Sequence, residues 1–268
     1  MKKRRRPRPD RPRRRGIYIL PNLFTSASLF SGFYSIIASF EGRFEAAAVA
    51  IIISCVLDGL DGRVARITNT TTKFGIEYDS LSDLVAFGVA PAVMAYLWAL
   101  QPIGRLGWLA CFMFVACGAL RLARFNVQKD VVDPSYFRGL PIPAAACFVA
   151  SVILFEGAVP AIGSIKDGLL LVIMYLLSFV MVSTLNYVSF KKLQLGQRKP
   201  FRVLVAIILS SMVIAYMPSV MFFVLLLVYV ISGPVMTALR IYRRRKYGDA
   251  PEPQTLASPN SEGESRQA

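Results

Sequence analysis

Long apolar runs, separated by short polar segments rich in Lys and Arg, dominate this sequence. A helix of about 20 apolar residues is long enough to cross roughly 30 Å of hydrocarbon. Hydrophobic residues make up 55% of the 268-residue chain, and the mean hydropathy is +0.51. A soluble domain balances apolar and charged residues more evenly, so the sequence predicts an all-α integral membrane protein. The eight expected spans are 23–40, 44–61, 79–100, 106–126, 141–159, 168–188, 203–217 and 220–239.

The basic residues are distributed unevenly between the two sides of this predicted bundle. If the N-terminus lies inside the cell, 28 of the 31 Lys and Arg residues fall on the cytoplasmic side, and only Arg43, Arg105 and Lys166 fall on the other. Cytoplasmic loops of membrane proteins collect Lys and Arg. We therefore expect an even number of spans, with both termini in the cytoplasm.

Nucleic-acid binding and a cleavable signal peptide fit the basic N-terminal arm less well. A net charge of +15 could suggest nucleic-acid binding, but topogenesis and attraction to anionic lipid headgroups account for the arm without it. A cleavable signal peptide would have a shorter apolar segment, followed by a small-residue cleavage site. We therefore expect no nucleic-acid partner and no removed leader.

Cysteine and histidine usage limits the available chemistry. The four cysteines, Cys55, Cys111, Cys117 and Cys147, lie in apolar runs without metal-ligand spacing, which is typical of small buried side chains. The chain has no histidine. A metal site would therefore need oxygen ligands and a hard cation such as Mg²⁺ or Mn²⁺. Proton transfer would fall to a carboxylate, Lys, Tyr or water.

Four aspartates lie within or beside apolar runs, where an ionisable group is costly unless it is paired, solvated or bound to metal. Asp58 and Asp61 are three residues apart, and Asp79 and Asp83 are four apart, so each pair projects from one face of its own helix. The short polar connection at 68–73 predicts that the two helices are antiparallel neighbours. We therefore expect all four carboxylates in one cavity, where their repulsion requires cations.

Small residues surround these acids and would let a phosphate ligand approach the helix backbone; they are Gly59, Gly62, Ala65 and Gly75. Arg66 would supply a fixed cation for a diphosphate. Two metal ions held by carboxylates favour phosphoryl transfer. The alternative is a solvated loop in which the acids pair with Arg63, Arg66 and Lys73, while the glycines serve helix packing.

The acids and small residues together form the pattern D-x2-D-G-x2-A-R-x8-G-x3-D-x3-D from Asp58 to Asp83, which resembles the signature of the CDP-alcohol phosphatidyltransferase family. The resemblance implies a bundle of six core transmembrane helices, here with two more at the C-terminal end, and a two-metal site on the cytoplasmic side. It implies that Asp58, Asp61 and Asp79 are metal ligands. Asp83 would lie beside the metals, as a ligand and as the general base.

The same resemblance assigns residues to the substrates. It implies that Gly62, Ala65 and Arg66 line the CDP moiety, with Gly75 beside them. Asn22 and Thr25 resemble positions near the nucleotide in this family, although helix N-capping accounts for such residues equally well.

Five further segments resemble the phosphatidylserine synthase subfamily. They are Y-I-L-P-N-L-F-T (18–25), D-S-L-S-D-L-V-A-F-G-V-A-P-A (79–92), R-L-A-R-F-N-V (121–127), F-R-G-L-P-I-P-A (137–144) and N-Y-V-S-F-K (186–191). The implied reaction transfers the phosphatidyl group of CDP-diacylglycerol to the hydroxyl of L-serine and releases CMP. Members that use glycerol phosphate usually carry D-P-x-A-D-K where this chain has D-S-L-S-D-L, which argues against that acceptor.

Several alternatives stay open at this point. Arg121 and Arg124 could contact a substrate carboxylate or phosphate, or could anchor their helix at the interface by snorkelling. The acceptor could be glycerol phosphate, inositol phosphate or choline. Intramembrane acids also mark transporters, but the helices show no evident repeat. Members of the family often form dimers. The expected partners of this chain are therefore membrane lipids and, as a further alternative, a second copy of itself.

The expected organisation of the chain follows from the basic runs and the extent of the resemblance. The segment after Tyr247 is rich in Pro, Ser, Glu and Gly and is predicted to be disordered. The four expected regions are a basic cytoplasmic arm at 1–16, a catalytic transmembrane domain at 17–190, two additional helices with basic flanks at 191–246, and the tail at 247–268.

Overall fold

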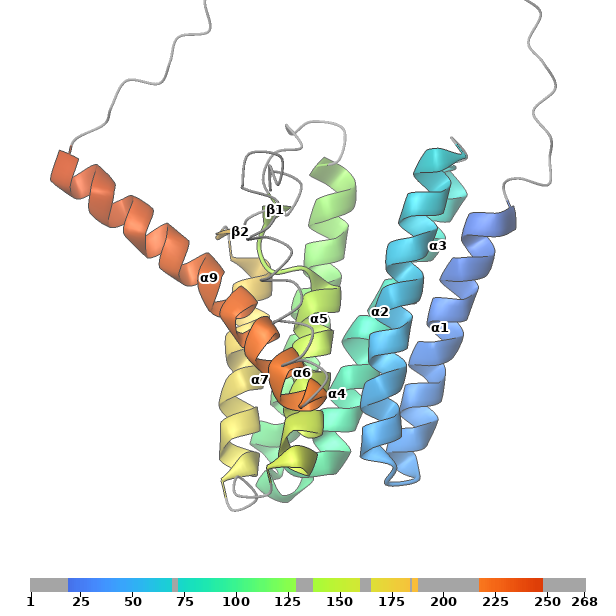
Figure 1. Cartoon of the computed structure of the whole chain (residues 1–268), viewed down its shortest axis with the longest axis horizontal. Coiled ribbons are helices and arrows are strands. Elements are labelled where there is room, and N and C mark those ends of the chain that lie inside the picture. Colours follow the sequence, from blue (N-terminus) through green and yellow to red (C-terminus); the bar gives the residue numbers. More distant parts are fainter. Residues whose placement is uncertain are drawn as a thin grey trace, which may run out of the picture.

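The computed structural model describes residues 19–68, 72–128, 137–159, 165–183, 185–187 and 217–247. These residues form an elongated bundle of helices (Figure 1). In chain order the α-helices are α1 (Ile19–Phe40), α2 (Phe44–Ile67), α3 (Lys73–Asp83), α4 (Ala90–Ala95), α5 (Arg105–Gln128), α6 (Ile142–Ala158), α7 (Lys166–Val182) and α9 (Pro218–Tyr247). The basic arm, the C-terminal tail and nearly all of the predicted span at 203–217 lie outside the described residues.

The other predicted spans fall on helical segments, except that the span predicted at 168–188 is too long: α7 ends at Val182, and Asn186–Tyr187 form strand β2. Among the described residues, four segments are long and apolar enough to cross a membrane: Pro21–Phe40, Lys73–Ile103, Arg105–Val127 and Pro218–Leu239. The described part is therefore largely helical and has the apolar segments expected of a membrane protein. The count of six core helices plus two stays a prediction, because α7 and α6 have only 17 residues each and α2 carries several charged side chains.

One short strand pair departs from the all-α prediction. Strand β1 (Phe137–Arg138) pairs antiparallel with β2 (Asn186–Tyr187), and the Gly139 amide continues the pairing by donating to the carbonyl oxygen of Leu185 at 2.8 Å. Gly139 has a φ of +81°, a backbone conformation that favours glycine. This turn directs the chain from the strand into α6.

The third apolar run is interrupted by π-helical turns. After Asp83 comes η2 (Leu84–Val89), then α4, then η3 (Tyr96–Leu100) and the 3₁₀ turn η4 (Gln101–Ile103). Pro91 in the first turn of α4 has no N–H to donate, and a proline ring clashes with the carbonyl four residues earlier in a regular helix. The wider turn of η2 relieves that clash. Such turns are frequent at functional sites, and this one begins directly after Asp83.

Helix α1 packs tightly against this widened turn because of one glycine. A Cβ added at Gly32 would lie 2.6 Å from the Cα and Cβ atoms of Ala86, which is buried in the core. Any larger residue at position 32 would push α1 away from η2. The contact therefore fixes the distance between α1 and the segment that carries Asp83.

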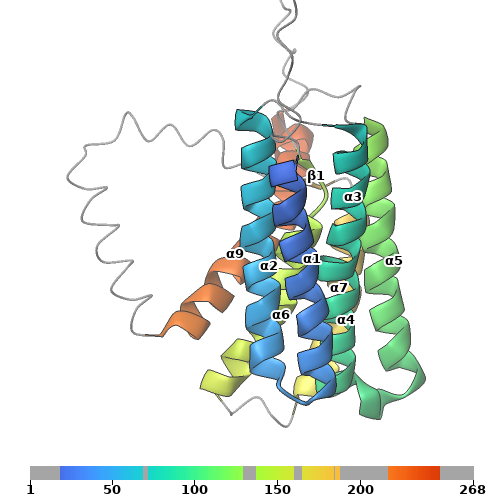
Figure 2. The same cartoon turned by 90° about the vertical axis from the view of Figure 1, so that its right-hand side faces the viewer.

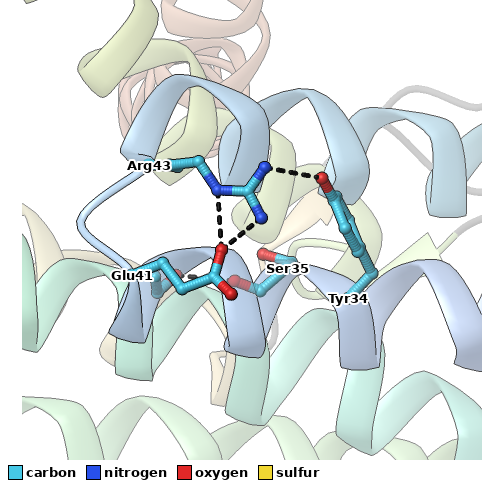
Figure 3. Close-up of polar contacts among 5 residues, drawn as sticks. Tyr34, Ser35, Glu41 and Arg43 are labelled. Carbon is cyan, nitrogen blue, oxygen red and sulfur yellow. Dashed lines mark hydrogen bonds and ion pairs between the residues drawn. The ribbon is translucent and has the colours of Figure 1, made fainter.

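The two ends of the bundle differ. One end of the bundle, at the top of Figure 1, brings together the start of α1, the end of α2, the start of α3, the end of α5 and the strand pair. We call this the acid end. At the opposite end, α1 and α2 are joined by a tight turn in which Gly42 has a φ of +73°. There Arg43 forms an ion pair with Glu41 and donates to the hydroxyl of Tyr34 at 3.4 Å (Figure 3).

Candidate active site

Three of the four aspartates bring their carboxylates together at the acid end. Oxygen atoms of Asp58 and Asp61 on α2 and of Asp79 on α3 all lie within 4.8 Å of one another, an arrangement that could hold a metal ion. Asp83 lies one turn after Asp79 on α3, near enough to Asp58, Asp61 and Asp79 for electrostatic interaction. The prediction that acids of the two helices meet is therefore confirmed for Asp58, Asp61 and Asp79.

The geometry fits a hard divalent cation. All the candidate ligands are carboxylate oxygens, which Mg²⁺ and Mn²⁺ prefer. At an effective dielectric constant of about 20, two like unit charges about 5 Å apart repel by roughly 3 kcal/mol. Three such carboxylates would resist being held together without a neutralising cation, and the helices that carry them fix their positions.

The helices that carry these acids meet through their side chains and not through close backbone packing. Helix α2 packs against α4 and η2 further along the bundle, but it makes few close backbone contacts with α3. Helix α1 packs along both, and Figures 1 and 2 together show it on one side of the pair. The acid side chains of α2 and α3 therefore meet beside α1.

The start of α3 is set by a side-chain cap. Thr72 has extended backbone angles, and its hydroxyl accepts a hydrogen bond from the Gly75 amide at 3.0 Å. A threonine in this position satisfies one of the amides that a helix N-terminus leaves without a partner. Because the helix begins at Lys73, Asp79 and Asp83 fall on successive turns of one face.

Thr25 connects α1 to both acid-bearing helices. Its hydroxyl donates to a carboxylate oxygen of Asp61 at 2.8 Å, and its backbone carbonyl accepts from the hydroxyl of Ser82 at 3.1 Å. Thr25, Asp61 and Ser82 are all buried. N-capping does not account for Thr25, since its side chain bonds to α2 from within α1.

Asn22 lies one turn earlier on α1 and faces α3. The side-chain oxygen of Asn22 would be 3.4 Å from a Cβ added at Gly75, and the hydroxyl of Thr72 would be 3.1 Å away. Gly75 thus leaves room for these two side chains. Gly59 differs, because a Cβ there would meet no atom within 4 Å, so the surface around it is open.

The two arginines near the end of α5 point to different parts of the structure. Arg121 is 8% exposed, lies near enough to Asp83 for Coulombic attraction, and its Nε atom has no hydrogen-bond partner among the described residues. Arg124 donates to the carbonyl oxygen of Val182 at 2.9 Å, at the end of α7. Arg121 therefore faces the acids, whereas Arg124 helps to join α5 to α7.

Among the described side chains, no ion pair joins Asp58, Asp61 or Asp83 to Arg63 or Lys73, as a solvated ion-pair loop would require. Ala65 and Arg66 belong to α2, but their side chains lie outside the described part of the structure, and so do their predicted contacts. The four cysteines are free thiols, buried or half-buried, as the sequence predicts.

Two residues near the site have no role in the sequence-based interpretation. The side-chain amide of Asn126 on α5 donates to the hydroxyl of Ser80 at 2.9 Å, beside Asp79. Tyr229 on α9 is half-buried and near enough to Arg121 for an electrostatic interaction. Asn126 could have been found from the R-L-A-R-F-N-V segment. No sequence signal distinguishes Tyr229 from other aromatic residues in an apolar run.

Comparison with known proteins assigns this arrangement to a family. The sequence profile for CDP-alcohol phosphatidyltransferase matches residues 18–183. The chain belongs to the CDP-alcohol phosphatidyltransferase family. It is therefore a membrane-embedded transferase, and the matched region includes all four aspartates, whereas Tyr229 and the rest of α9 lie beyond it.

Several relatives carry a more specific name. A protein of Helicobacter pylori named CDP-diacylglycerol–serine O-phosphatidyltransferase is 46% identical over 178 residues, which cover 66% of this chain and 75% of the relative. A protein of Bacillus subtilis with the same name is 33% identical over 65% of this chain and 92% of its own length. An archaetidylserine synthase of Methanothermobacter thermautotrophicus is 36% identical over 63% of this chain and 69% of its own length.

Proposed function

We propose that this chain is a phosphatidylserine synthase, which transfers the phosphatidyl group from CDP-diacylglycerol to the hydroxyl of L-serine and releases CMP. The meeting of carboxylates from α2 and α3 at one point is the structural observation that supports this reaction most strongly. The names of the similar proteins from Helicobacter pylori and Bacillus subtilis support serine as the acceptor.

Asp58, Asp61, Asp79 and Asp83 would hold two divalent ions, either Mg²⁺ or Mn²⁺. When bound, such ions would offset the negative charge of the carboxylates and of the diphosphate. Asp58, Asp61 and Asp79 would serve chiefly as ligands, since their oxygens form the compact group. Asp83 lies beside that group and is the candidate for a second role.

That second role is general base. The serine hydroxyl is a weak nucleophile at neutral pH, and the chain has no histidine to activate it. Asp83 would accept the hydroxyl proton as the serine oxygen forms a bond to the phosphorus that carries diacylglycerol. The bond between that phosphorus and the CMP oxygen breaks, and CMP leaves with its electron pair.

The proposed contacts of the protein with the nucleotide follow from the family motif. We propose that Gly62, Ala65 and Arg66 line the CDP moiety, that Gly75 lies beside them, and that Asn22 and Thr25 border the nucleotide from α1. Support for the α1 residues comes from the contacts of Thr25 with Asp61 and from the position of Asn22 against Gly75.

The acceptor site would involve the arginines of α5. Serine carries a carboxylate, which a buried guanidinium binds well through paired hydrogen bonds. The position of Arg121 near Asp83 favours Arg121 for this contact, and so does its Nε donor, which has no hydrogen-bond partner among the described residues. Arg124 would contribute charge nearby while it holds the end of α7.

The bundle would place its acid end at the cytoplasmic face of the cell membrane. The distribution of 28 against three basic residues supports cytoplasmic termini and an eight-span chain, with six core helices and two more at 191–246. A reporter enzyme that is active only in the cytoplasm should work when fused after Lys246, and one that is active only outside should be silent. The reverse pattern would contradict this topology.

We also propose two kinds of partner, which are the membrane lipids around the bundle and a second copy of the chain in a homodimer. The described helices leave many large apolar side chains exposed, as expected for contact with lipid. We assign no dimer interface. The regions at 1–16, 17–190, 191–246 and 247–268 keep their proposed roles as basic arm, catalytic domain, additional helices and tail.

The main alternative is that the chain uses the acceptor alcohol of another family member, because the members share the motif around the acids. Purified protein supplied with CDP-diacylglycerol and labelled serine, glycerol phosphate, inositol phosphate or choline in separate reactions would distinguish these activities. We expect only serine to enter lipid. Transfer to one of the other alcohols and not to serine would reject the proposed acceptor. Membership of a transferase family removes the support for a transporter.

A further inference from the structure

Thr25 forms polar contacts from α1 to both helices that carry the acid cluster. Its side chain reaches Asp61 on α2, and its main chain reaches Ser82, the neighbour of Asp83 on α3. Other hydroxyls of α1 also bond to α2, but further from the acids. Ser31, for example, donates to the carbonyl oxygen of Ala50 at 2.8 Å.

The hydroxyl of Thr25 has two acceptors within reach. It lies 2.8 Å from the Asp61 carboxylate oxygen and 3.2 Å from the carbonyl oxygen of Pro21, one turn earlier in α1. Threonines inside helices often donate to that carbonyl. A hydroxyl has one proton, and the shorter distance together with the charged acceptor favours Asp61.

A hydrogen bond to one oxygen of a carboxylate restricts its rotation. The second oxygen is then held in a fixed direction, and the charge of the group is partly balanced before any cation arrives. Groups that orient metal ligands in this way typically change metal affinity by about 10- to 100-fold when they are removed. Thr25 is 4% exposed and Asp61 is 5% exposed, so water cannot easily replace the lost donor.

The main-chain contact adds a second constraint. The Thr25 carbonyl already lies at a fixed place in α1, so the bond from Ser82 sets the position of α3 relative to Asp61. The backbones of α2 and α3 make few close contacts, whereas α1 packs closely along both, so the contacts of α1 contribute to their spacing. The close approach of Gly32 to Ala86 supports the same spacing two turns further along α1.

We propose that Thr25 is a positioning residue that sets the metal affinity of the site, by orienting Asp61 through its hydroxyl and by spacing α2 from α3 through Ser82. The proposal rests on the proposed role of the aspartates as metal ligands. It differs from a nucleotide contact because it requires an effect on metal binding in the absence of CDP-diacylglycerol.

The test is Mn²⁺ binding by purified protein in detergent, followed by electron paramagnetic resonance of the free ion, without either substrate. Thr25→Val keeps the shape of the side chain and removes the donor, and Thr25→Ser keeps the donor. Ser31→Ala is the matched control, because it removes another buried hydroxyl bond between α1 and α2. Asp61→Asn reports the loss of the ligand itself.

We expect Thr25→Val to weaken Mn²⁺ binding by about tenfold or more. Thr25→Ser and Ser31→Ala should stay close to the parent protein. In an Asp61→Asn background, Thr25→Val should cause little further loss, because the hydroxyl acts through Asp61. Parent-like binding by Thr25→Val, or equal losses in Thr25→Val and Ser31→Ala, would overturn the proposal while leaving the metal site intact.

Two further outcomes have distinct meanings. If the parent protein binds no Mn²⁺, the proposed metal site fails, and the role of Thr25 fails with it. If Thr25→Val cannot be recovered in folded form, Thr25→Cys replaces it, since a thiol is a weaker donor than a hydroxyl. Weaker binding by Thr25→Cys than by Thr25→Ser would then support the proposal, and equal binding would overturn it.

Discussion

Glu41 at one end of the bundle and the aspartates at the acid end are carboxylates in different surroundings. Glu41 is exposed and pairs with Arg43, two residues away in the same turn (Figure 3). The aspartates come from α2 and α3, which both pack against α1, and oxygens of Asp58, Asp61 and Asp79 lie within 4.8 Å of one another. Among the described side chains, none forms an ion pair with Asp58, Asp61 or Asp83.

The difference shows which of the two arrangements is unfavourable by itself. A pair such as Glu41 and Arg43 forms from neighbours in sequence, is screened by solvent and adds little to stability. A cluster of carboxylates that are buried or half-buried opposes folding unless something else neutralises it. The packing of α1 against both α2 and α3 maintains this unfavourable grouping, which is expected at a site that binds cations and substrate charge.

Removing one charge from the acid cluster should have the largest effect on activity. Replacing Asp58, Asp61 or Asp79 singly with Asn should lower serine transfer by orders of magnitude and weaken metal binding, because each loses a charged ligand. Chelation should reproduce the loss, and added Mg²⁺ or Mn²⁺ should reverse it. Glu77→Gln is the control, since Glu77 is exposed on α3 outside the cluster. Near-normal turnover in any of the three variants would argue against a shared site.

Asp83→Asn separates the base from the ligands. If Asp83 is chiefly the base, this variant should bind metal and CDP-diacylglycerol nearly as well as the parent but transfer the phosphatidyl group very slowly, because the deficit is confined to the transition state. Isothermal titration and single-turnover rates on the same preparation provide the measurement. A parallel loss of binding and rate would reassign Asp83 as a ligand.

The arginines of α5 should differ in their effects. Arg121→Gln should raise the KM for serine by about 10- to 100-fold, since a charge-assisted bond contributes about 1.5–3 kcal/mol, with little change in the KM for CDP-diacylglycerol. Arg124→Gln should lower the melting temperature, because the bond to Val182 is lost, with a smaller change in KM. Equal KM effects in the two variants would contradict the separate roles.

Substitutions in the Glu41–Arg43 pair, at the end of the bundle opposite the acids, should have the smallest effect on activity. Glu41→Gln and Arg43→Gln, alone or together, should leave serine transfer and melting temperature unchanged within error, because their pair is exposed and local. Turnover and thermal unfolding measured on the same protein would check this. A marked loss of activity would show that the two ends of the bundle are coupled, contrary to this expectation.

The sequence predicts the helices and the acids better than their arrangement. Apolar runs reveal helices because a membrane imposes their length, and the spacing of Asp58 and Asp61 places both on one face. The packing of α1 against both α2 and α3 could not be derived, since it depends on contacts between residues far apart in sequence, such as Gly32 and Ala86.

The same limit applies to individual side chains. Arg121 and Arg124 have the same chemistry and lie three residues apart, but only the packing of α7 shows that Arg124 is engaged elsewhere. The π-helical turn after Asp83 has a local cause in Pro91, yet a proline in a sequence can end, kink or widen a helix. Predicting which occurs requires the neighbouring helices.

The most direct test of the acid cluster's function is the incorporation of radiolabelled serine into lipid by purified protein, with CMP release measured in the same reaction. We expect labelled lipid and CMP to form in equal amounts, only when CDP-diacylglycerol and a divalent cation are both present, and neither to form with Asp61→Asn. Serine incorporation that persists in excess chelator, or that is unchanged in Asp61→Asn, would contradict a metal-dependent transfer at this site.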